Sequence, residues 1–373
     1  MDLERPKTPC ALVDLDRLEA NARGMAARAA ALGVRLRPHV KTHKCVEIAA
    51  RQVTPPFQGV TVSTLAEAHA FADGGFCDLT WAFPLPPDRV DEALDLARRV
   101  DALHLTVDHE ASVDALERAC RRRDASASVL LEVDCGARRA GVDPSSDRAL
   151  RLAKRIADSD ALAFRGLLTH GGHAYGARSR DEIAPIAAAE RDAVVRLAAR
   201  LREAGIGVPE VSVGSTPTMR VVDHLEGVTE IRPGNYVLFD AFQAAIGSCA
   251  LEEVAISILA TVVGAYPDQR KVIVNAGAIA LSTDPGPTHV DPACGFGVVA
   301  AADGRTLHDD LRVFSLSQEH GQIRGEGVTD RFRIGDRLRI LPNHACVAAA
   351  QHDRLFAIRD GAVVETWRPV RGW

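Results

Sequence analysis

The chain has 373 residues, 47% of them hydrophobic and 25% charged, with a net charge of −5, as is ordinary for a globular protein of one large or two smaller domains. The negative charge argues against binding to nucleic acid, and no apolar run approaches the roughly 20 residues that a membrane helix needs. The first residues lack the apolar core of a signal peptide, and the eight cysteines form no CxxC pair, so we expect a cytoplasmic protein with reduced thiols.

Between residues 16 and 245, short apolar runs alternate with amphipathic runs rich in Ala, Leu, Arg and Glu. The amphipathic runs predict helices, for example over 67–72, 90–99 and 187–204. Eight strand–helix units in about 230 residues match a (β/α)8 barrel better than a doubly wound sheet, and no GxGxxG motif follows the first strand. The eight predicted strands begin near 34–36, 59–62, 79–81, 103–107, 129–133, 164–168, 210–213 and 229–231.

After Asp240 helical runs are nearly absent, and strand-like runs are separated by Gly, Asp and Pro. This pattern predicts a C-terminal antiparallel β domain. We expect the strand over 10–13 to join it, before Asp16 caps the first barrel helix. The predicted domains are therefore 15–245 for the barrel and 246–373, together with 1–14, for the β domain. The predicted β runs are 254–263, 271–274, 311–314, 337–340 and 362–367.

Lys41 follows the first predicted strand, within the basic segment 37–44. It would lie at the C-terminal mouth of the barrel, where barrel enzymes place their active sites. If the strand continues, His39 and Lys41 share one face. Nearby cationic groups would lower the pKa of the lysine, as a lysine that forms a Schiff base requires. A surface lysine in a basic turn is the alternative.

Polar loops follow the last four predicted strands. Residues 213–218 and 232–235 follow strands seven and eight, and their N–H groups and hydroxyls suit a phosphate, which barrels often bind there. A helix cap and a turn explain the same residues. Residues 169–175 follow strand six and offer two imidazoles and a phenol to an aromatic cofactor. Arg139 follows strand five, where it would pair with an anionic oxygen.

His344 and Cys346 are two residues apart near the C-terminus. In a strand they would share a face and form half of a zinc site. Unless a remote third ligand exists, water and substrate fill the other positions, which is typical of a catalytic metal. A buried strand with an inert thiol is the alternative. The polar cluster at 317–321 would support the ligands or form a turn.

With these motifs, the chain resembles the family of D-serine dehydratase, D-threonine aldolase and D-threo-3-hydroxyaspartate dehydratase. These are fold-type III pyridoxal phosphate enzymes with an alanine-racemase-like barrel. The resemblance spans nearly the whole chain and is carried by 37–42, 213–218, 318–321 and 342–346. It implies a small-molecule D-amino acid substrate, pyridoxal phosphate as cofactor, and a homodimer.

The resemblance also implies roles for single residues. Lys41 would bind the cofactor covalently, His170 would lie against the cofactor ring, and both are predicted to act in catalysis. Arg139 matches an arginine near the phenolic oxygen of the cofactor. Tyr175 is the candidate beside the ring nitrogen, with Arg232 as its rival. The residues implied to hold the phosphate are Gly214, Ser215, Thr216, Gly234 and Asn235.

His344 and Cys346 match the metal ligands of the family, with the sequence His-Ala-Cys that the dehydratases share. The aldolases have His-Cys-Asp instead. A thiolate favours zinc, and manganese or magnesium are the alternatives. The metal would bind the β-hydroxyl of the substrate while Lys41 removes the α proton, with the two groups reaching one substrate from different domains.

We therefore expect a dehydratase that converts D-serine, D-threonine or D-threo-3-hydroxyaspartate to a 2-oxo acid and ammonia. Cleavage of the same substrates to glycine and an aldehyde is the alternative. An amino-acid racemase and a non-enzymatic cofactor carrier are further alternatives. His173 stands where some relatives carry a small polar residue, so the side chain of the substrate stays open.

Overall fold

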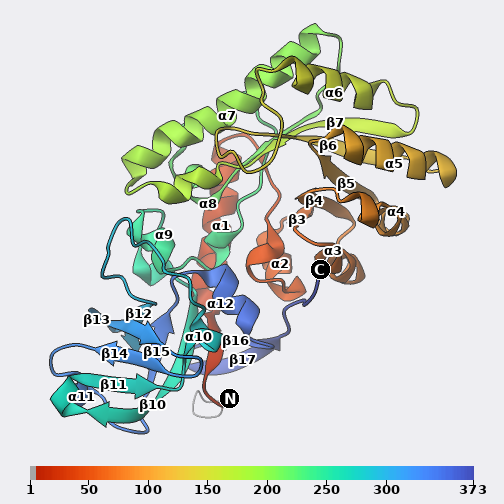
Figure 1. The fold of residues 1–373 in the computed structure, drawn as a ribbon. Helices are drawn as coiled ribbons and strands as arrows, with labels where there is room; N and C mark the ends of the chain where they lie inside the picture. The colour runs from red at the N-terminus through yellow and green to blue at the C-terminus, as the bar shows by residue number, and fades with distance from the viewer. Residues whose placement is uncertain (1–5) are drawn as a thin grey trace. The chain divides into compact units, whose positions relative to one another are not determined.

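The computed structural model describes residues 6–373, which divide into two compact units (Figure 1). The barrel unit consists of Gly24–Gly234 and Val370–Trp373, and the β unit of the residues up to Arg23 and Asn235–Pro369. Within residues 6–373, no helix is both long enough and apolar enough to cross a membrane.

The barrel unit contains eight parallel strands in the order β2-β9-β8-β7-β6-β5-β4-β3. A parallel bridge between His39 and Thr61 connects the two ends of this order. The predicted (β/α)8 barrel is therefore confirmed, and all eight predicted strands are present. Their bounds are β2 Arg35–Leu36, β3 Val60–Val62, β4 Asp78–Pro84, β5 Ala102–Val107, β6 Ala127–Val133, β7 Leu162–Thr169, β8 Glu210–Val213 and β9 Glu230–Ile231.

Helix α1 precedes the first barrel strand, and helices α2 to α8 follow strands β2 to β8 (Figure 1). The helix predicted over 187–204 begins earlier, because the Ser179 side chain accepts a hydrogen bond from the Glu182 N–H and caps it there. The cap of the first helix was wrongly predicted: Asp14 Oδ1 accepts from the Arg17 N–H at 3.1 Å, and Asp16 lies inside the helix. The helices are α1 Leu15–Ala31, α2 Val46–Gln52, α3 Leu65–Asp73, α4 Val90–Ala97, α5 Glu110–Arg122, α6 Asp147–Ala157, α7 Arg180–Glu203 and α8 Thr216–Val221.

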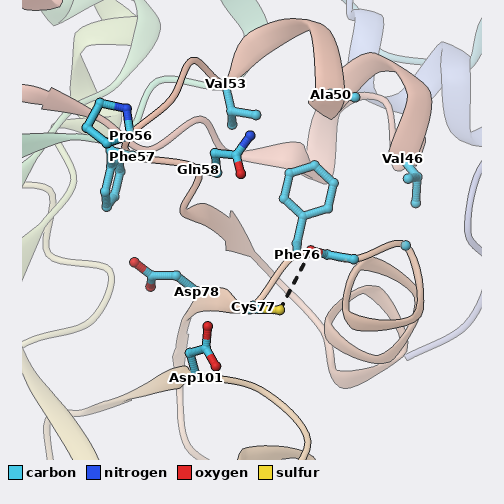
Figure 2. A pocket seen from close by; sticks show the side chains of 12 residues that line it. Val46, Ala50, Val53, Pro56, Phe57, Gln58, Phe76, Cys77, Asp78 and Asp101 are labelled. Atoms are coloured by element: carbon cyan, nitrogen blue, oxygen red, sulfur yellow. Dashed lines mark hydrogen bonds between the residues drawn. The ribbon is translucent and has the colours of Figure 1, made fainter.

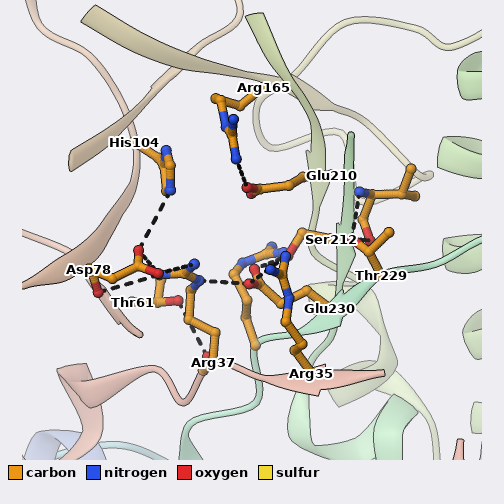
Figure 3. A network of polar contacts seen from close by, with 12 residues as sticks. Arg35, Arg37, Thr61, Asp78, His104, Arg165, Glu210, Ser212, Thr229 and Glu230 are labelled. Carbon is orange, nitrogen blue, oxygen red and sulfur yellow. Dashed lines mark hydrogen bonds and ion pairs between the residues drawn. The ribbon is translucent and has the colours of Figure 1, made fainter. Parts of the chain in front are cut away.

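The interior of the barrel contains a buried polar network (Figure 3). Arg37 is 1% exposed and donates to Glu230 Oε2 at 2.7 Å and to Asp78 Oδ1 at 2.6 Å. Glu230 Oε1 accepts from Ser212 Oγ at 2.8 Å, and Ser212 Oγ also accepts from Arg232. Buried charges are costly unless they are paired, so the network makes these groups tolerable inside the barrel. The bond to Ser212 also fixes the position of the Arg232 Nη1 group.

The β unit contains nine strands, and six of them form a closed barrel in the order β11-β14-β13-β12-β15-β10, with β10 pairing back to β11. The strand predicted at the N-terminus joins this sheet, antiparallel to β10 and parallel to β16. The predictions missed the short β12, β14 and β16. The bounds are β1 Cys10–Asp14, β10 Ile256–Tyr266, β11 Lys271–Val274, β12 Val298–Ala301, β13 Leu307–Leu316, β14 Gly321–Arg324, β15 Arg337–Leu341, β16 Leu355–Arg359 and β17 Ala362–Trp367.

The C-terminal segment of the β unit starts at Asn235, whereas the sequence-based division came after residue 245. Residues 235–245 belong to the β unit because the N–H groups of Ala241 and Phe242 donate to the carbonyls of Pro342 and Asn343. The short helices of this unit are α9 Ala241–Ala245, α10 Ala278–Leu281, α11 Val328–Arg331 and α12 Ala345–Gln351.

The strand predicted through His344 and Cys346 is wrong. Strand β15 ends at Leu341, and Pro342 follows, which has no N–H to continue a sheet. His344 is the N-cap of α12, and its carbonyl accepts from the Ala348 N–H at 3.0 Å. The two side chains are therefore brought together by a helix start and not by strand alternation.

Candidate active site

Lys41 lies in the 3-10 turn η1, Val40–Thr42, which follows β2. The strand does not continue to Lys41, so Lys41 and His39 do not share a strand face. Both nevertheless line one pocket at the C-terminal ends of the barrel strands. The pocket is lined by His39, Lys41, Ala82, Glu132, Arg139, Leu168, His170, Gly214 and Arg232.

The two histidines of the pocket are held in the neutral form. Burial, and then the nearby Lys41, lower the pKa of His170 to about 3. Burial, followed by Lys41 and Arg232, also holds the pKa of His39 well below its ordinary value. His170 Nδ1 lies 3.0 Å from the Gly214 carbonyl oxygen, so Nδ1 carries the hydrogen and Nε2 is an acceptor. The cationic groups beside Lys41 are therefore arginines.

Arg232 lines the pocket and Tyr175 does not. Arg232 is 4% exposed, and its Nη2 donates to the Thr169 carbonyl at 2.6 Å. Burial lowers its pKa to about 10, which leaves it charged at neutral pH. Tyr175 is half-buried in the turn η3, Gly172–Gly176. The geometry of the barrel unit thus favours Arg232, the rival in the sequence-based assignment, as the group that faces the pocket.

The loop after β8 uses much of its hydrogen-bonding capacity internally. Ser215 caps α8, and its side chain and that of Thr218 bond reciprocally to each other's N–H groups. The Gly214 N–H donates to Glu190 Oε1 at 3.0 Å. Gly234 lies against η1, where an added Cβ would be 2.7 Å from the His39 carbonyl oxygen. Asn235 belongs to the β unit, and its Nδ2 donates to Asp240 at 2.7 Å.

Glu190, on α7, joins two of the loops at the mouth of the barrel. Its Oε1 accepts from the Gly171 N–H at 2.5 Å as well as from the Gly214 N–H. The side chain is fully buried, and burial raises its pKa. A Cβ at position 171 would lie 2.9 Å from the Glu190 carboxyl carbon, which accounts for the glycine there. Glu190 therefore fixes the loop that carries His170 against the loop after β8.

His344 and Cys346 are adjacent to an acidic group in the β unit. His344 Nδ1 lies 2.7 Å from Asp284 Oδ2, which leaves Nε2 as the nitrogen for a metal. Although burial opposes it, hydrogen bonds to Asp284 and to Cys346 raise the pKa of His344 to about 11. Asp240 adds further negative charge. Among the described residues, no cluster of three or more ligating side chains is present.

A larger hollow of about 520 Å³ lies elsewhere in the barrel unit (Figure 2). It includes Phe57, Phe76 and Cys77. Asp78 opens β4 and Asp101 precedes β5, so the hollow lies at the N-terminal ends of the strands. This is the end of the barrel opposite to Lys41, and barrel enzymes place their chemistry at the C-terminal end.

Two family models match the chain. The model of the alanine racemase N-terminal domain matches residues 13–241, and that of the D-serine dehydratase domain matches residues 255–358. D-threo-3-hydroxyaspartate dehydratase of Delftia sp. strain HT23 is 40% identical, over 98% of each chain. The chain belongs to the D-serine dehydratase and D-threonine aldolase family.

Other members of this family show how far the likeness extends. D-serine dehydratase of Dictyostelium discoideum is 33% identical, over 100% of this chain and 98% of its own. D-threonine aldolase of an Arthrobacter species is 31% identical, over 98% of this chain and 92% of its own. The crystal structure of the Delftia dehydratase superimposes with a TM-score of 0.96 at 39% identity, covering 100% of both chains. Alanine variants of that enzyme at a histidine and at a cysteine have also been solved, the cysteine variant in a metal-free form.

Sequence reasoning missed three acidic residues: Glu132 at the pocket, Glu190 between two loops of the barrel mouth, and Asp284 beside His344. Glu132 interrupts an apolar strand run, which is a signal that could have found it. Glu190 lies in an Ala- and Arg-rich helix, and Asp284 in a Pro- and Gly-rich loop, where an acidic residue is unremarkable. Their significance comes from contacts with residues distant in the sequence.

Proposed function

We propose that this chain is a lyase of D-3-hydroxy amino acids that depends on pyridoxal phosphate and a divalent metal, and that it dehydrates its substrate to a 2-oxo acid and ammonia. The observation that carries the proposal is the pocket in which Lys41 is surrounded by Arg139, Arg232 and two neutral histidines. The names of the relatives supply the substrate class. The His-Ala-Cys sequence supports dehydration over cleavage.

The residues of the pocket fit pyridoxal phosphate. The pocket offers one amine and two guanidinium groups, and His39 Nδ1 and Glu132 Oε2 are buried without a hydrogen-bond partner among the described residues. When bound, pyridoxal phosphate takes up the negative charge that develops at the α carbon of the substrate. Lys41 would hold it covalently. The other proposed contacts are Arg139 at the phenolic oxygen, His170 against the ring, Arg232 at the ring nitrogen, and Ser215, Thr216, Gly234 and Asn235 around the phosphate.

Lys41 is the proposed base. Its Nζ would accept the α proton of the substrate, in the pocket that Arg139 and Arg232 also line. His170 is a weak base for this proton transfer, because burial and the nearby Lys41 lower its pKa to about 3. The hydrogen bond from its Nδ1 to the Gly214 carbonyl instead fixes the orientation of the imidazole.

His344 and Cys346 are the proposed metal ligands. Asp284 holds the Nδ1 hydrogen of His344, and a metal would displace the hydrogen on Nε2, so the imidazole and the Cys346 sulfur suit a divalent cation. Two protein ligands leave positions open for water and for the β-hydroxyl of the substrate. A metal there would act as a Lewis acid, and the thiolate favours zinc over manganese or magnesium. The histidine and cysteine substituted in the Delftia enzyme have the same spacing of two residues.

A product assay tests the proposal. The D and L forms of serine, threonine and 3-hydroxyaspartate are incubated with the protein, and 2-oxo acid and glycine are measured together. We expect 2-oxo acid from D isomers alone. Glycine and an aldehyde as main products would establish the aldolase alternative, inversion alone a racemase, and cofactor binding without turnover a carrier.

The position of the cofactor is tested separately. Borohydride reduction followed by peptide mass spectrometry should find the cofactor on Lys41, and a Lys41→Ala variant should not be labelled. Label on another lysine contradicts the assignment.

We also propose a homodimer, which light scattering would detect as twice the chain mass of 40.0 kDa.

A further inference from the structure

Glu132 lies near the C-terminal end of β6, Ala127–Val133, and lines the same pocket as Lys41. It is 5% exposed. Among the described residues that line the pocket, it is the one carboxylate. Burying a carboxylate is costly unless a positive charge compensates it, so its position requires an explanation.

The partners of Glu132 are basic residues of the pocket. Its Oε1 lies 3.8 Å from Arg139 Nη2, and its Oε2 has no hydrogen-bond partner among the described residues. The Arg139 side chain is 58% exposed, whereas that of Glu132 is 7% exposed. Glu132 is therefore a buried acidic group beside a largely exposed arginine side chain.

The charges around Glu132 support this arrangement. Burial raises the pKa of Glu132 to about 6, so the carboxylate is largely ionised at neutral pH. Arg139 and Arg232 stabilise the carboxylate, and Asp108 and Asp134 oppose it from the neighbouring loops. The unpartnered Oε2 is left available for a bound group.

We propose that Glu132 is a positioning residue of this site: it holds the Arg139 guanidinium at the pocket and offsets the positive charge of the basic residues around Lys41. The inference rests on the proposed function, because it assumes that an anionic cofactor binds beside Lys41. The proposed role predicts a result for Glu132 variants that a purely structural role would not give. Removing the Glu132 charge should help an anionic cofactor to enter while impairing turnover, because Arg139 is no longer held.

The test compares Glu132→Gln with the unmodified protein and with Glu117→Gln. Glu117 is a matched control on the outer helix α5, where it pairs with Arg155 at 3.2 Å. Cofactor-free protein is mixed with pyridoxal phosphate at pH 7.5, and the rate of covalent uptake is followed by absorbance. We expect uptake by Glu132→Gln to be roughly threefold to tenfold faster. Uptake that is unchanged or slower overturns the proposal, and so does a similar change in Glu117→Gln.

A double-variant comparison tests the link to Arg139. Once loaded with cofactor, Glu132→Gln should lose turnover by about tenfold or more, and Glu132→Gln combined with Arg139→Ala should turn over no more slowly than Arg139→Ala alone. If the losses of turnover in the two single variants multiply in the double variant, the residues act independently and the positioning role is overturned. Glu132→Asp keeps the charge, and its rate of uptake should stay within about twofold of the unmodified protein.

The outcomes separate this inference from the proposed function. If the unmodified protein takes up no pyridoxal phosphate, or if Lys41→Ala still binds it covalently, the proposed function fails. If uptake requires Lys41 and Glu132→Gln behaves as the unmodified protein does, the role of Glu132 alone is refuted.

Discussion

Single acidic residues organise the groups that carry the proposed chemistry. Glu190 accepts two backbone N–H groups, Glu132 faces Arg139, and Asp284 contacts His344. Each of them acts on another residue that sequence reasoning had already singled out. The roles of the three carboxylates can therefore be tested through the behaviour of their partners.

The first residue-scale prediction concerns Glu190. Glu190→Ala leaves the N–H groups of Gly171 and Gly214 without their acceptor, and such hydrogen bonds each contribute about 0.5–1.5 kcal/mol. We expect the dissociation constant for pyridoxal phosphate to rise about tenfold in a fluorescence titration. Glu190→Gln keeps an acceptor oxygen and serves as the control. Equal affinity for pyridoxal phosphate in Glu190→Ala and the unmodified protein would show that the hydrogen bonds of Glu190 to the two loops do not affect cofactor binding.

The second residue-scale prediction concerns Asp284. Asp284→Ala removes the acceptor that holds His344 Nδ1, and losing such a partner typically costs about 10–100-fold in metal affinity. We expect a weakening of this size for zinc in a chelator competition assay. Asp303→Asn, in an exposed turn of the β unit, is the control. Unchanged zinc affinity in Asp284→Ala would show that this aspartate does not support the proposed metal site.

At the scale of elements, strand β7 contains a glycine that its packing requires. Gly166 has φ +137°, and a Cβ there would lie 1.9 Å from the Glu210 carbonyl oxygen in β8. The pairing of β6 with β7 also shifts register between Val129 and Leu130. Together these features allow β7 to bend while it remains in the barrel.

We therefore expect Gly166→Ala to destabilise the barrel unit by more than about 2 kcal/mol, since strain and the displaced β8 backbone add to one another. Urea denaturation followed by circular dichroism measures the change. Gly207→Ala is the matched control, because a Cβ there meets nothing within 4 Å. If the Gly166→Ala variant is as stable as this control, packing in β7 does not require a glycine at position 166.

At the scale of the whole molecule, the buried network in the barrel unit makes stability depend on pH (Figure 3). Although burial opposes it, hydrogen bonds with His104 and Arg37 hold the pKa of Asp78 well below its usual range. Against burial, Arg37 likewise lowers the pKa of Glu230. Groups with a lowered pKa in the folded state contribute stability that is present above their unfolded pKa, about 4, and lost as the pH falls below it.

We expect the free energy of unfolding to fall as the pH is lowered from about 5 towards the depressed pKa values. Asp78→Asn should be less stable than the unmodified protein at pH 7 but should lose less stability on acidification. Urea denaturation at pH 7, 5 and 3.5 measures both effects. If acidification lowers the free energy of unfolding equally in the two proteins, this network does not cause the loss of stability at low pH.

The sequence by itself determined the barrel, the β domain and most of the residues at the barrel mouth. Strand formation depends on local apolar runs, and the side chains that follow parallel strands meet at one end of a barrel, so Lys41, His170 and Arg232 could be placed together. Three short strands, β12, β14 and β16, were missed, although the equally short β1, β11 and β15 were predicted.

Only the tertiary structure decided which groups act on these residues. Glu190 reaches the Gly214 N–H across 24 positions, and Asp284 reaches His344 across 60, so no local pattern relates them. The helix start at His344 depends likewise on where β15 ends. The physical reason is that hydrogen bonds and charge pairs are set by distance in space, whereas hydrophobic periodicity reports only which face of an element is buried.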